Sequence, residues 1–410
     1  MAVGVAGGGR GRAWLTVPLC CLAALAEGFD IQSMGVAAPT LAPALRLTRD
    51  QLGPVFSAST LGLLVGAIVL GRLADRVGRR WTLIASLAIY GVFSLATAAA
   101  WDFTSLAVIR VLAGVGLGGA MPNMIALAAE AVAEARRARF VAVMAATMPF
   151  GGVVASLAAA SLDWRSIFVV GGVWPLAVAA LMMLSLPESH RFLTARQAQA
   201  EDAASAPSYA HVLFGGGRAA ATLALWIAAF AMLLQLYLIL NWLPTLMGAK
   251  GVSKPDAAWV QVLFNLGGGL GGLAIAALFS GARRAATFTV WFVGMAAGVV
   301  LLSQAAPTLM ASGLAGLAAG LFIPSAPTAI YALAPDYYGV AMRGTGVGAV
   351  IGMGRLGAIA GPILAAALLA SGQGVAGVLL GMLPFVALAA AATFAALSRR
   401  PAAQISPAAA

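Results

Sequence analysis

Charged residues are scarce in this sequence. Lys, Arg, Asp and Glu make up 9% of its 410 residues, and 62% are hydrophobic. An ordinary soluble domain is about 25% charged and roughly 45–50% apolar, so this composition excludes a soluble globular fold. The apolar runs repeat along the chain at lengths of about 20 residues, which is what a helix needs to cross a bilayer. The sequence therefore predicts a membrane protein with many spans.

Cysteine and histidine are almost absent. The two cysteines, Cys20 and Cys21, are adjacent and provide no spacing for a metal site or a disulfide framework. The two histidines, His190 and His211, lie in the longest polar stretch, which excludes a histidine proton relay inside the membrane. No arrangement of nucleophile, base and metal is visible, so we expect neither an enzyme nor a bound cofactor or metal.

The apolar runs predict an all-α membrane protein with twelve transmembrane helices. The expected spans are 14–40, 52–70, 81–100, 104–129, 140–160, 166–186, 219–246, 257–280, 287–305, 309–334, 345–370 and 374–397. The polar residues 187–217 separate six helices from six. We therefore predict an N-terminal six-helix half at 1–186, a cytoplasmic central loop at 187–217 and a C-terminal six-helix half at 218–410.

An internal repeat supports this division. The tripeptide PTL at 39–41 recurs at 244–246, an offset of 205. A second set corresponds with an offset of 206: Glu130 to Asp336, Arg137 to Arg343 and Gly151 to Gly357. Parallel repeats of this kind occur in secondary transporters, whose substrate site lies near the midplane between the halves.

The basic residues indicate how the chain crosses the membrane. The net charge of +11 comes from scattered short loops, whereas nucleic acid binding requires a clustered basic face. If the N-terminus is cytoplasmic, 17 of the 24 Lys and Arg residues lie on that side and five lie outside. This excess follows the positive-inside rule and predicts that both termini lie in the cytoplasm.

The start of the chain allows another interpretation. Arg10, Arg12, a short apolar stretch and the sequence Ala-Leu-Ala at 24–26 together resemble a signal peptide with its cleavage site. Cleavage would leave the helix expected at 219–246 without its counterpart in the repeat. We therefore expect the first span to be retained.

The stretch GRLADRVGRR at 71–80 joins the second expected helix to the third and resembles the signature loop of the major facilitator superfamily. With the twelve spans and the repeat, the resemblance extends over essentially the whole chain and implies the family's fold. It also implies a role in the cytoplasmic gate for Asp75, Arg76, Arg79 and Arg80. The alternative is that these arginines only fix the topology. The equivalent loop at 280–285 lacks the acidic residue.

Two further segments, EAVAEARRARF at 130–140 and DYYGVAMRG at 336–344, resemble the family's second acidic and basic cluster. The expected gating pairs are Glu130 with Arg137 and Asp336 with Arg343. They would connect the cytoplasmic ends of helices and break on opening. Exposed pairs of this kind contribute little stability.

The segments EGFD (27–30), VIRVLAGVGLGGAMPN (108–123) and GRLGAIAGP (354–362) resemble the aromatic acid:proton symporter branch of the superfamily. Most members have Asp where this chain has Glu27. The sequences EGFDIQSMGVAAP (27–39) and LNWLPTL (240–246) most resemble those of the 3-(3-hydroxyphenyl)propionate transporters within that branch. The resemblance implies import of an aromatic monocarboxylate, of the hydroxyphenylpropionate or hydroxybenzoate type, with protons, by a protein that works as a monomer.

The two acids of EGFD are the expected proton-coupling residues. Glu27 and Asp30 are three positions apart, so they share one face of a helix. Desolvation and mutual repulsion both favour the protonated form of a carboxyl group, and intramembrane ionisable residues are functional by default. The alternative is that each acid is held permanently by an arginine as a structural ion pair.

Arg110 and Arg355 fall inside expected helices, one in each half. A guanidinium group presents forked donors that match a carboxylate, so we expect both to bind the substrate. The alternative for Arg110 is a fixed counter-ion to the acids at 27 and 30. An aromatic substrate also needs apolar surface with a few polar contacts, and the candidates are Asn123, Gln235, Tyr237, Asn241, Trp242 and Tyr331. Each of these also fits bonding between helices or a place at the lipid interface.

The combined prediction is proton-coupled uptake of an aromatic monocarboxylate across the inner membrane by alternating access. A proton-coupled exporter of drugs or metabolites with the same fold is the alternative, because these residues do not define the direction of transport. A less favoured alternative is a sensor that binds the acid without transporting it.

Overall fold

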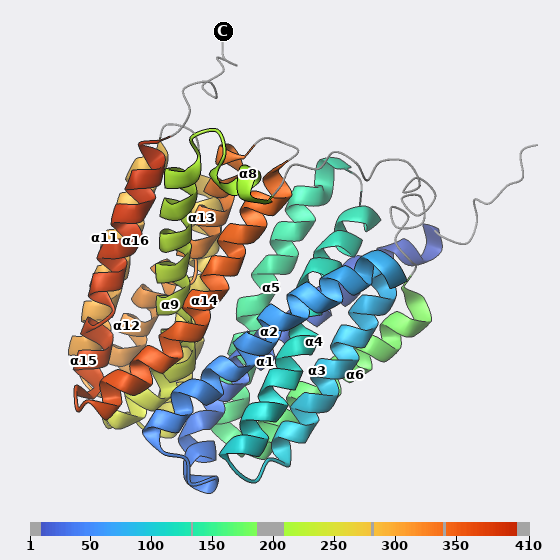
Figure 1. The fold of residues 1–410 in the computed structure, drawn as a ribbon. Helices are drawn as coiled ribbons and strands as arrows, with labels where there is room; N and C mark the ends of the chain where they lie inside the picture. Colours follow the sequence, from blue (N-terminus) through green and yellow to red (C-terminus); the bar gives the residue numbers. More distant parts are fainter. Residues whose placement is uncertain (1–9, 133, 187–208, 280–282, 339–341, 400–410) are drawn as a thin grey trace, which may run out of the picture. The chain divides into compact units, whose positions relative to one another are not determined.

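The computed structural model describes residues 10–132, 134–186, 209–279, 283–338 and 342–399. Within these ranges, the side chains of residues 10–14, 75, 129, 134–143, 145 and 146 are not described. Every regular element in the described ranges is a helix (Figure 1). The all-α prediction is therefore confirmed.

The chain groups into two compact units. Unit 1 comprises Met1–Ala203 and Ser253–Val262, and unit 2 comprises Ala204–Val252 and Leu263–Ala410. The helices of the first segment are α1 (Arg10–Ala44), α2 (Arg49–Val77), α3 (Arg79–Ala98), α4 (Phe103–Ala131), α5 (Glu134–Ser161) and α6 (Trp164–Ser185). Within unit 1, α1 packs on α5 and α6, α2 packs on α4, and α3 packs on α4 and α6.

Unit 2 contains shorter helices as well as long ones. The helices that follow α6 are α8 (Tyr209–Phe214), α9 (Ala219–Ala249), α10 (Lys254–Leu278), α11 (Arg284–Gln304), α12 (Leu309–Phe322), α13 (Ala326–Leu333), the 3-10 helix η2 (Ala334–Tyr337), α14 (Arg343–Ala370), α15 (Gly374–Leu380) and α16 (Leu383–Leu397). The first part of α10 belongs to unit 1. Within unit 2, α9 packs on α14 and α16, and α11 packs on α12 and α16.

The helices supply the expected set of membrane spans. Eleven segments of the described chain are long and apolar enough to cross a bilayer: Leu15–Ala44, Arg49–Ala74, Arg79–Ala98, Phe103–Ala128, Trp164–Ser185, Ala219–Ala249, Lys254–Leu278, Arg284–Gln304, Leu309–Tyr337, Arg343–Ala370 and Gly374–Leu397. A shorter apolar stretch, Thr147–Ser161 in α5, is the twelfth. The predicted fold class of a multi-span helical membrane protein is confirmed.

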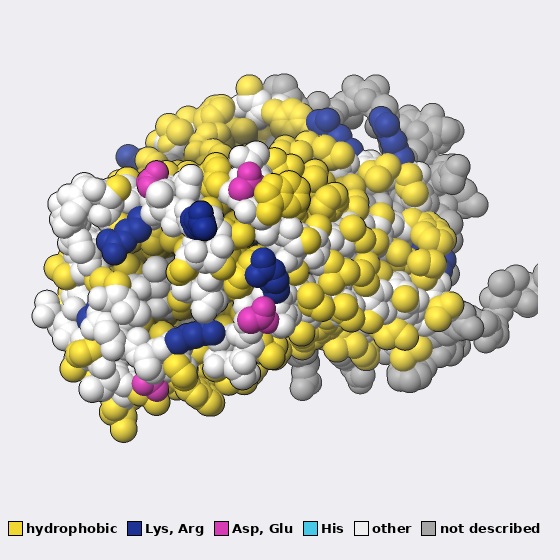
Figure 2. Space-filling model, turned by 90° about the horizontal axis from the view of Figure 1, so that it is seen from below, with side chains coloured by type: hydrophobic (Ala, Val, Ile, Leu, Met, Phe, Trp, Pro, Cys, Tyr) yellow, Lys and Arg dark blue, Asp and Glu magenta, His cyan; other side chains and the backbone are white. Residues whose placement is uncertain are grey.

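The outer surface fits a lipid environment. Large apolar side chains point outward along many helices, among them Leu273, Val293 and Leu314, each more than half exposed. Figure 2 shows hydrophobic side chains spread over much of the face it presents, with Lys, Arg, Asp and Glu at separate points. Soluble monomers rarely expose apolar surface on this scale, whereas lipid tails cover it without cost.

Two helices begin at an aspartate that caps the backbone. Asp102 accepts a hydrogen bond from the Ser105 backbone N–H at 2.8 Å, and Asp163 accepts one from the Ser166 backbone N–H at 3.2 Å. Hydrogen bonding to Ser105 lowers the pKa of Asp102 below its ordinary value of 3.8, and hydrogen bonding to Ser166 lowers the pKa of Asp163 in the same way. Both caps therefore favour the charged carboxylate.

These caps predict a pH-dependent contribution to stability. Because the folded pKa is lower than the unfolded one, the stabilisation is present above about pH 4 and is lost as the pH falls through the folded pKa. We expect the melting temperature of the double variant Asp102→Ala/Asp163→Ala to lie below that of the unmodified protein at pH 7. The gap should narrow at pH 3. A gap that is the same at both pH values would contradict this account.

Glycines at helix crossings repeat the same contacts in both units. An added Cβ at Gly66 of α2 would overlap the backbone of α4 at Val115, and one at Gly271 of α10 would overlap the backbone of α12 at Leu321. Gly151 of α5 faces Leu25 of α1 in the same way, and Gly357 of α14 faces Phe230 of α9. The corresponding residues are offset by 205 or 206, as the sequence repeat predicts. Close backbone approach at small residues is a common way to pack helices in lipid.

We expect Gly271→Ala to lower the thermal stability of the purified protein. The new methyl group has no room beside the α12 backbone, and overpacking of this kind costs about 1–3 kcal/mol. Gly272→Ala in the same helix is the matched control, because an added Cβ there meets nothing within 4 Å. Equal melting temperatures for the two variants in detergent would show that α10 and α12 separate without cost.

Candidate functional site

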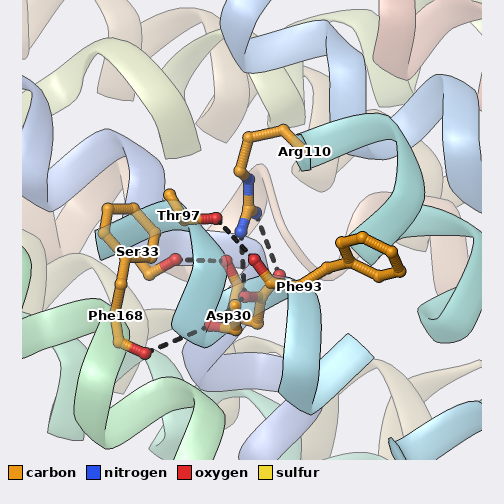
Figure 3. Close-up of polar contacts among 7 residues, drawn as sticks. Asp30, Ser33, Phe93, Thr97, Arg110 and Phe168 are labelled. Carbon is orange, nitrogen blue, oxygen red and sulfur yellow. Dashed lines mark hydrogen bonds and ion pairs between the residues drawn. The ribbon is translucent and has the colours of Figure 1, made fainter. Parts of the chain in front are cut away.

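A buried ion pair joins α1 to α4 within unit 1. The Arg110 guanidinium donates from Nη1 to Asp30 Oδ1 at 3.0 Å and from Nη2 to Asp30 Oδ2 at 2.9 Å (Figure 3). The two side chains are 1% and 0% exposed. A bidentate contact between guanidinium and carboxylate is among the strongest hydrogen-bonded arrangements in proteins. The structure thus joins a residue expected to couple protons to one expected to bind substrate.

Further polar groups fix the position of Asp30. The Ser94 hydroxyl of α3 lies 3.4 Å from Asp30 Oδ1 and 3.4 Å from the Phe168 carbonyl oxygen of α6. The Ser33 hydroxyl donates to the Asp30 carbonyl oxygen at 2.8 Å (Figure 3). The Arg110 guanidinium carbon also lies 5.5 Å from the centre of the Phe168 ring. Four helices, α1, α3, α4 and α6, therefore build this site.

Glu27 lies one turn before Asp30 in α1 and is 1% exposed. Its neighbours in sequence, Ala24 and Ala26, belong to the apolar core of unit 1. Burying an ionisable group in such surroundings is costly. Both acids of EGFD are therefore in the interior, which fits a group that changes its protonation state.

Unit 2 has its own polar cluster, which unites three of the predicted substrate residues. Arg355 of α14 donates from Nη1 to the Tyr237 hydroxyl of α9 at 2.8 Å. Tyr331 of α13 lies beside them, because an added Cβ at Gly354 would be 2.9 Å from the Tyr331 hydroxyl. Tyr237 is buried, while Arg355 and Tyr331 are partly exposed within the unit. One fixed positive charge and two phenol hydroxyls thus lie together.

The other predicted substrate residues make bonds that support the helices. The bonds to backbone carbonyls are Asn123 to Gly119 at 2.7 Å, Gln235 to Ala231 at 3.1 Å, Asn241 to Tyr237 at 2.8 Å and Trp242 to Pro362 at 3.1 Å. The Trp242 bond ties α9 to α14, and its side chain is 0% exposed. Gln235 keeps a buried Oε1 with no hydrogen-bond partner among the described residues, so it has capacity to accept a further donor.

Among the described residues, an ion pair joins helix ends in each unit. Arg79 at the start of α3 pairs with Glu130 near the end of α4, and Arg284 at the start of α11 pairs with Asp336 of η2. The two pairs are equivalent under the sequence repeat. The side chain of Arg137 lies outside the described residues, and the expected pairings of Glu130 with Arg137 and of Asp336 with Arg343 stay predictions. The basic residue of the loop at 280–285 therefore does have an acidic partner, supplied by another segment.

The remaining residues of the expected gate lie near these pairs in sequence. Arg80 donates to the Met183 carbonyl oxygen at 2.8 Å and lies 4.8 Å from the centre of the Trp81 ring. Arg76 and Arg343 are exposed. The side chains of Asp75 and Arg137 lie outside the part of the chain that the structure describes.

Ser94 and Ser33 were missed by sequence reasoning. The available signal was the spacing of polar residues in α3, where Ser86, Tyr90 and Ser94 recur every four positions in an apolar helix. Residues at this spacing share one helix face. Across the described residues, no group of three or more His, Cys, Asp or Glu side chains lies together as a metal site would require.

The chain is similar to known transporters. The model of the Major Facilitator Superfamily matches residues 20–246. The 3-(3-hydroxy-phenyl)propionate transporter of Escherichia coli (strain K12) is 43% identical over 392 residues, which is 95% of each chain. The gallate transporter of Pseudomonas putida is 36% identical over 390 residues, covering 88% of this chain and 86% of that one. The crystal structure of the nucleoside transporter NupG has a TM-score of 0.76 at 14% identity, covering 94% of this chain and 99% of that one, a likeness of fold alone.

Proposed function

Because this chain belongs to the major facilitator superfamily, we propose that it imports an aromatic carboxylic acid across the cell membrane together with protons. Its relatives are transporters, so the prediction that it is not an enzyme is confirmed. The two relatives described above are named for acids that carry both a carboxylate and a hydroxylated ring. Their similarity over most of the chain supports a substrate of the same class, of the hydroxyphenylpropionate or hydroxybenzoate type.

The main support for proton coupling is the bidentate contact between Asp30 and Arg110. When Asp30 is charged, it occupies the forked donors of the guanidinium. A proton on Asp30 removes that charge, and the guanidinium N–H donors of Arg110 become available to the carboxylate of the substrate. When the proton leaves, Asp30 recaptures Arg110 and displaces the substrate. Two carboxylates that compete for one guanidinium thus couple proton binding to substrate binding.

The charge balance supports this scheme. Burying an uncompensated charge is far more costly than burying a paired one. Charged Asp30 with Arg110 is neutral as a pair, and protonated Asp30 with Arg110 and a substrate carboxylate is also neutral. Neither state leaves an uncompensated charge on Asp30 or Arg110. We assign Glu27, one turn away, to the transfer of protons to and from Asp30.

Arg355 is the second proposed contact for the substrate. With Tyr237 and Tyr331 it offers a forked cation and two hydroxyl groups, which suit an oxygen-rich aromatic acid. Gln235 adds an acceptor for a ring hydroxyl. Asn241 and Trp242 contribute by holding the helices that carry these groups, and Asn123 contributes in the same way within α4, the helix that carries Arg110.

We expect Arg355→Lys to raise the KM for the transported acid by about tenfold or more, because a hydrogen bond to a charged group is worth about 1.5–3 kcal/mol. Lysine keeps the charge but loses the fork. The maximal rate should change less than KM does. Arg283→Lys is the matched control, since Arg283 is exposed in the same unit. An unchanged KM for Arg355→Lys would remove Arg355 from the substrate site.

We also propose that the charged residues at the helix ends form the cytoplasmic gate. The pairs of Arg79 with Glu130 and Arg284 with Asp336 are partly exposed, and such pairs contribute little stability. They can therefore break and re-form at low cost during a transport cycle. The remaining gate residues are Asp75, Arg76, Arg80, Arg137 and Arg343.

The orientation follows from the basic residues. With the N-terminus inside, the excess of Lys and Arg lies on the cytoplasmic side, as the positive-inside rule requires. We propose a multi-pass protein of the bacterial inner membrane, with both termini cytoplasmic, that functions as a monomer.

The experiment that tests this function is uptake of labelled 3-(3-hydroxyphenyl)propionate into proteoliposomes with an imposed inward proton gradient. We expect accumulation that a protonophore abolishes, with gallate and 4-hydroxybenzoate tested as competitors. Folded protein that accumulates none of these acids would contradict the proposal. Gradient-driven efflux of the same acids would indicate export instead.

A further inference from the structure

A line of buried hydroxyl groups runs along α3, away from the pair of Asp30 and Arg110. Thr82, Ser86, Tyr90 and Ser94 are spaced four residues apart, and each is 0% or 1% exposed. Successive members of such a series lie about 6 Å apart along the helix axis. The series begins at Ser94, beside Asp30, and ends one turn from Arg79.

Two of these hydroxyls have no hydrogen-bond partner among the described residues: Ser86 Oγ and Tyr90 Oη. Thr82, in contrast, donates to the Gly78 carbonyl oxygen at 2.8 Å. Buried polar groups nearly always bond to protein or to ordered water. Tyr90 also belongs to the apolar core of unit 1, where Leu83 and Leu87 of the same helix pack. Apolar packing alone does not explain why hydroxyls occupy these positions.

The surroundings connect this line to the proton site. Ser94, one turn from Tyr90, lies 3.4 Å from Asp30 Oδ1. On the opposite side, α4 lies directly against α3, because an added Cβ at Gly116 would meet Tyr90 and one at Gly119 would meet the Ser86 hydroxyl. The Ser86 hydroxyl and the base of the Tyr90 side chain thus lie against α4, shielded from lipid.

We propose that Tyr90 and Ser86, bridged by water, conduct the proton that leaves Asp30 to the end of α3 at Arg79. This inference rests on the proposed proton coupling. A hydroxyl group both accepts and donates a hydrogen bond, so each member takes a proton on its oxygen and passes its own proton onward. Neither hydroxyl has to ionise. At the end of the transfer Asp30 is a carboxylate paired with Arg110, and the proton is in water at the helix ends.

The test compares two transport modes in variants that remove only a hydroxyl, Tyr90→Phe and Ser86→Ala. Gradient-driven uptake requires the proton to leave Asp30 in every cycle. Counterflow exchange of labelled for unlabelled substrate returns the carrier with its proton still bound. Ser156→Ala is the control, because Ser156 is equally buried but donates to the Gly152 carbonyl oxygen within α5.

We expect gradient-driven uptake to slow by about tenfold or more in each α3 variant, a modest loss for a positioned proton-transfer group, while counterflow remains within about twofold and Ser156→Ala behaves like the unmodified protein. Unchanged gradient-driven uptake in both variants would overturn the relay and leave the symport intact. Equal losses in both modes would also overturn it, since they would indicate a structural role. Absence of gradient-driven uptake in the unmodified protein would instead remove the proposed function.

Discussion

Asp30→Asn is expected to abolish gradient-driven accumulation while counterflow exchange continues. Asparagine has the shape of a protonated aspartate but cannot release a proton. Arg110 would then remain available to the substrate carboxylate in every state of the cycle. In the unmodified protein, one coupled proton and a gradient of one pH unit support accumulation of up to about tenfold. In the variant the internal concentration should only reach the external one.

Counterflow is the internal control of that experiment, because it reports on a folded carrier that still binds substrate. Asp50→Asn provides a second control, since Asp50 is exposed at the start of α2. If Asp30→Asn still concentrates the acid as the unmodified protein does, Asp30 is not the coupling group. Glu27 would then be the remaining candidate on that face of α1.

Much of this fold follows from composition, because a bilayer demands long apolar helices and little else in its interior. Composition did not predict the breaks in the helix within two of the membrane spans. One span is divided into α12 and α13, with Pro324 between them and Pro327 in the first turn of α13, and another into α15 and α16, which begins at Leu383 with Pro384. Both segments nevertheless have a mean hydropathy high enough for a membrane span. Hydropathy alone does not locate breaks of this kind.

The acids and arginines of the candidate site were found from the sequence, which also gave Arg110 as a counter-ion to the acids at 27 and 30 as an alternative. Glu130 was matched to Arg137 by proximity along the chain, and the side chain of Arg137 is not described. The structure pairs Glu130 with Arg79, which α3 brings to the end of α4. Asp30 and Arg110 are 80 residues apart, and no local pattern connects them. The types of charged residue in an apolar helix indicate a site. Only the packing of α1, α3, α4 and α6 determines which of them meet.

Removal of one member of the central pair is expected to destabilise the protein more than removal of both. Arg110→Leu leaves the carboxylate of Asp30 buried without its partner, and breaking a buried pair in this way costs about 3–5 kcal/mol. The double variant Asp30→Leu/Arg110→Leu removes both charges and fills the space with apolar groups. Replacements of that kind are often neutral or stabilising.

The measurement is the melting temperature of each purified variant in the same detergent, with Arg165→Leu as the control at an exposed position. We expect the single variant to melt well below the unmodified protein and the double variant to recover most of the difference. Equal melting temperatures for the single and double variants would mean that Asp30 finds other compensation when Arg110 is absent. In that case the competition between Asp30 and the substrate for one guanidinium would lose its energetic basis. If the double variant recovers its melting temperature but does not accumulate substrate, the contributions of the pair to stability and to transport are separate. Stability requires only that the buried groups be neutral together, whereas coupling requires that Asp30 gain and lose a proton.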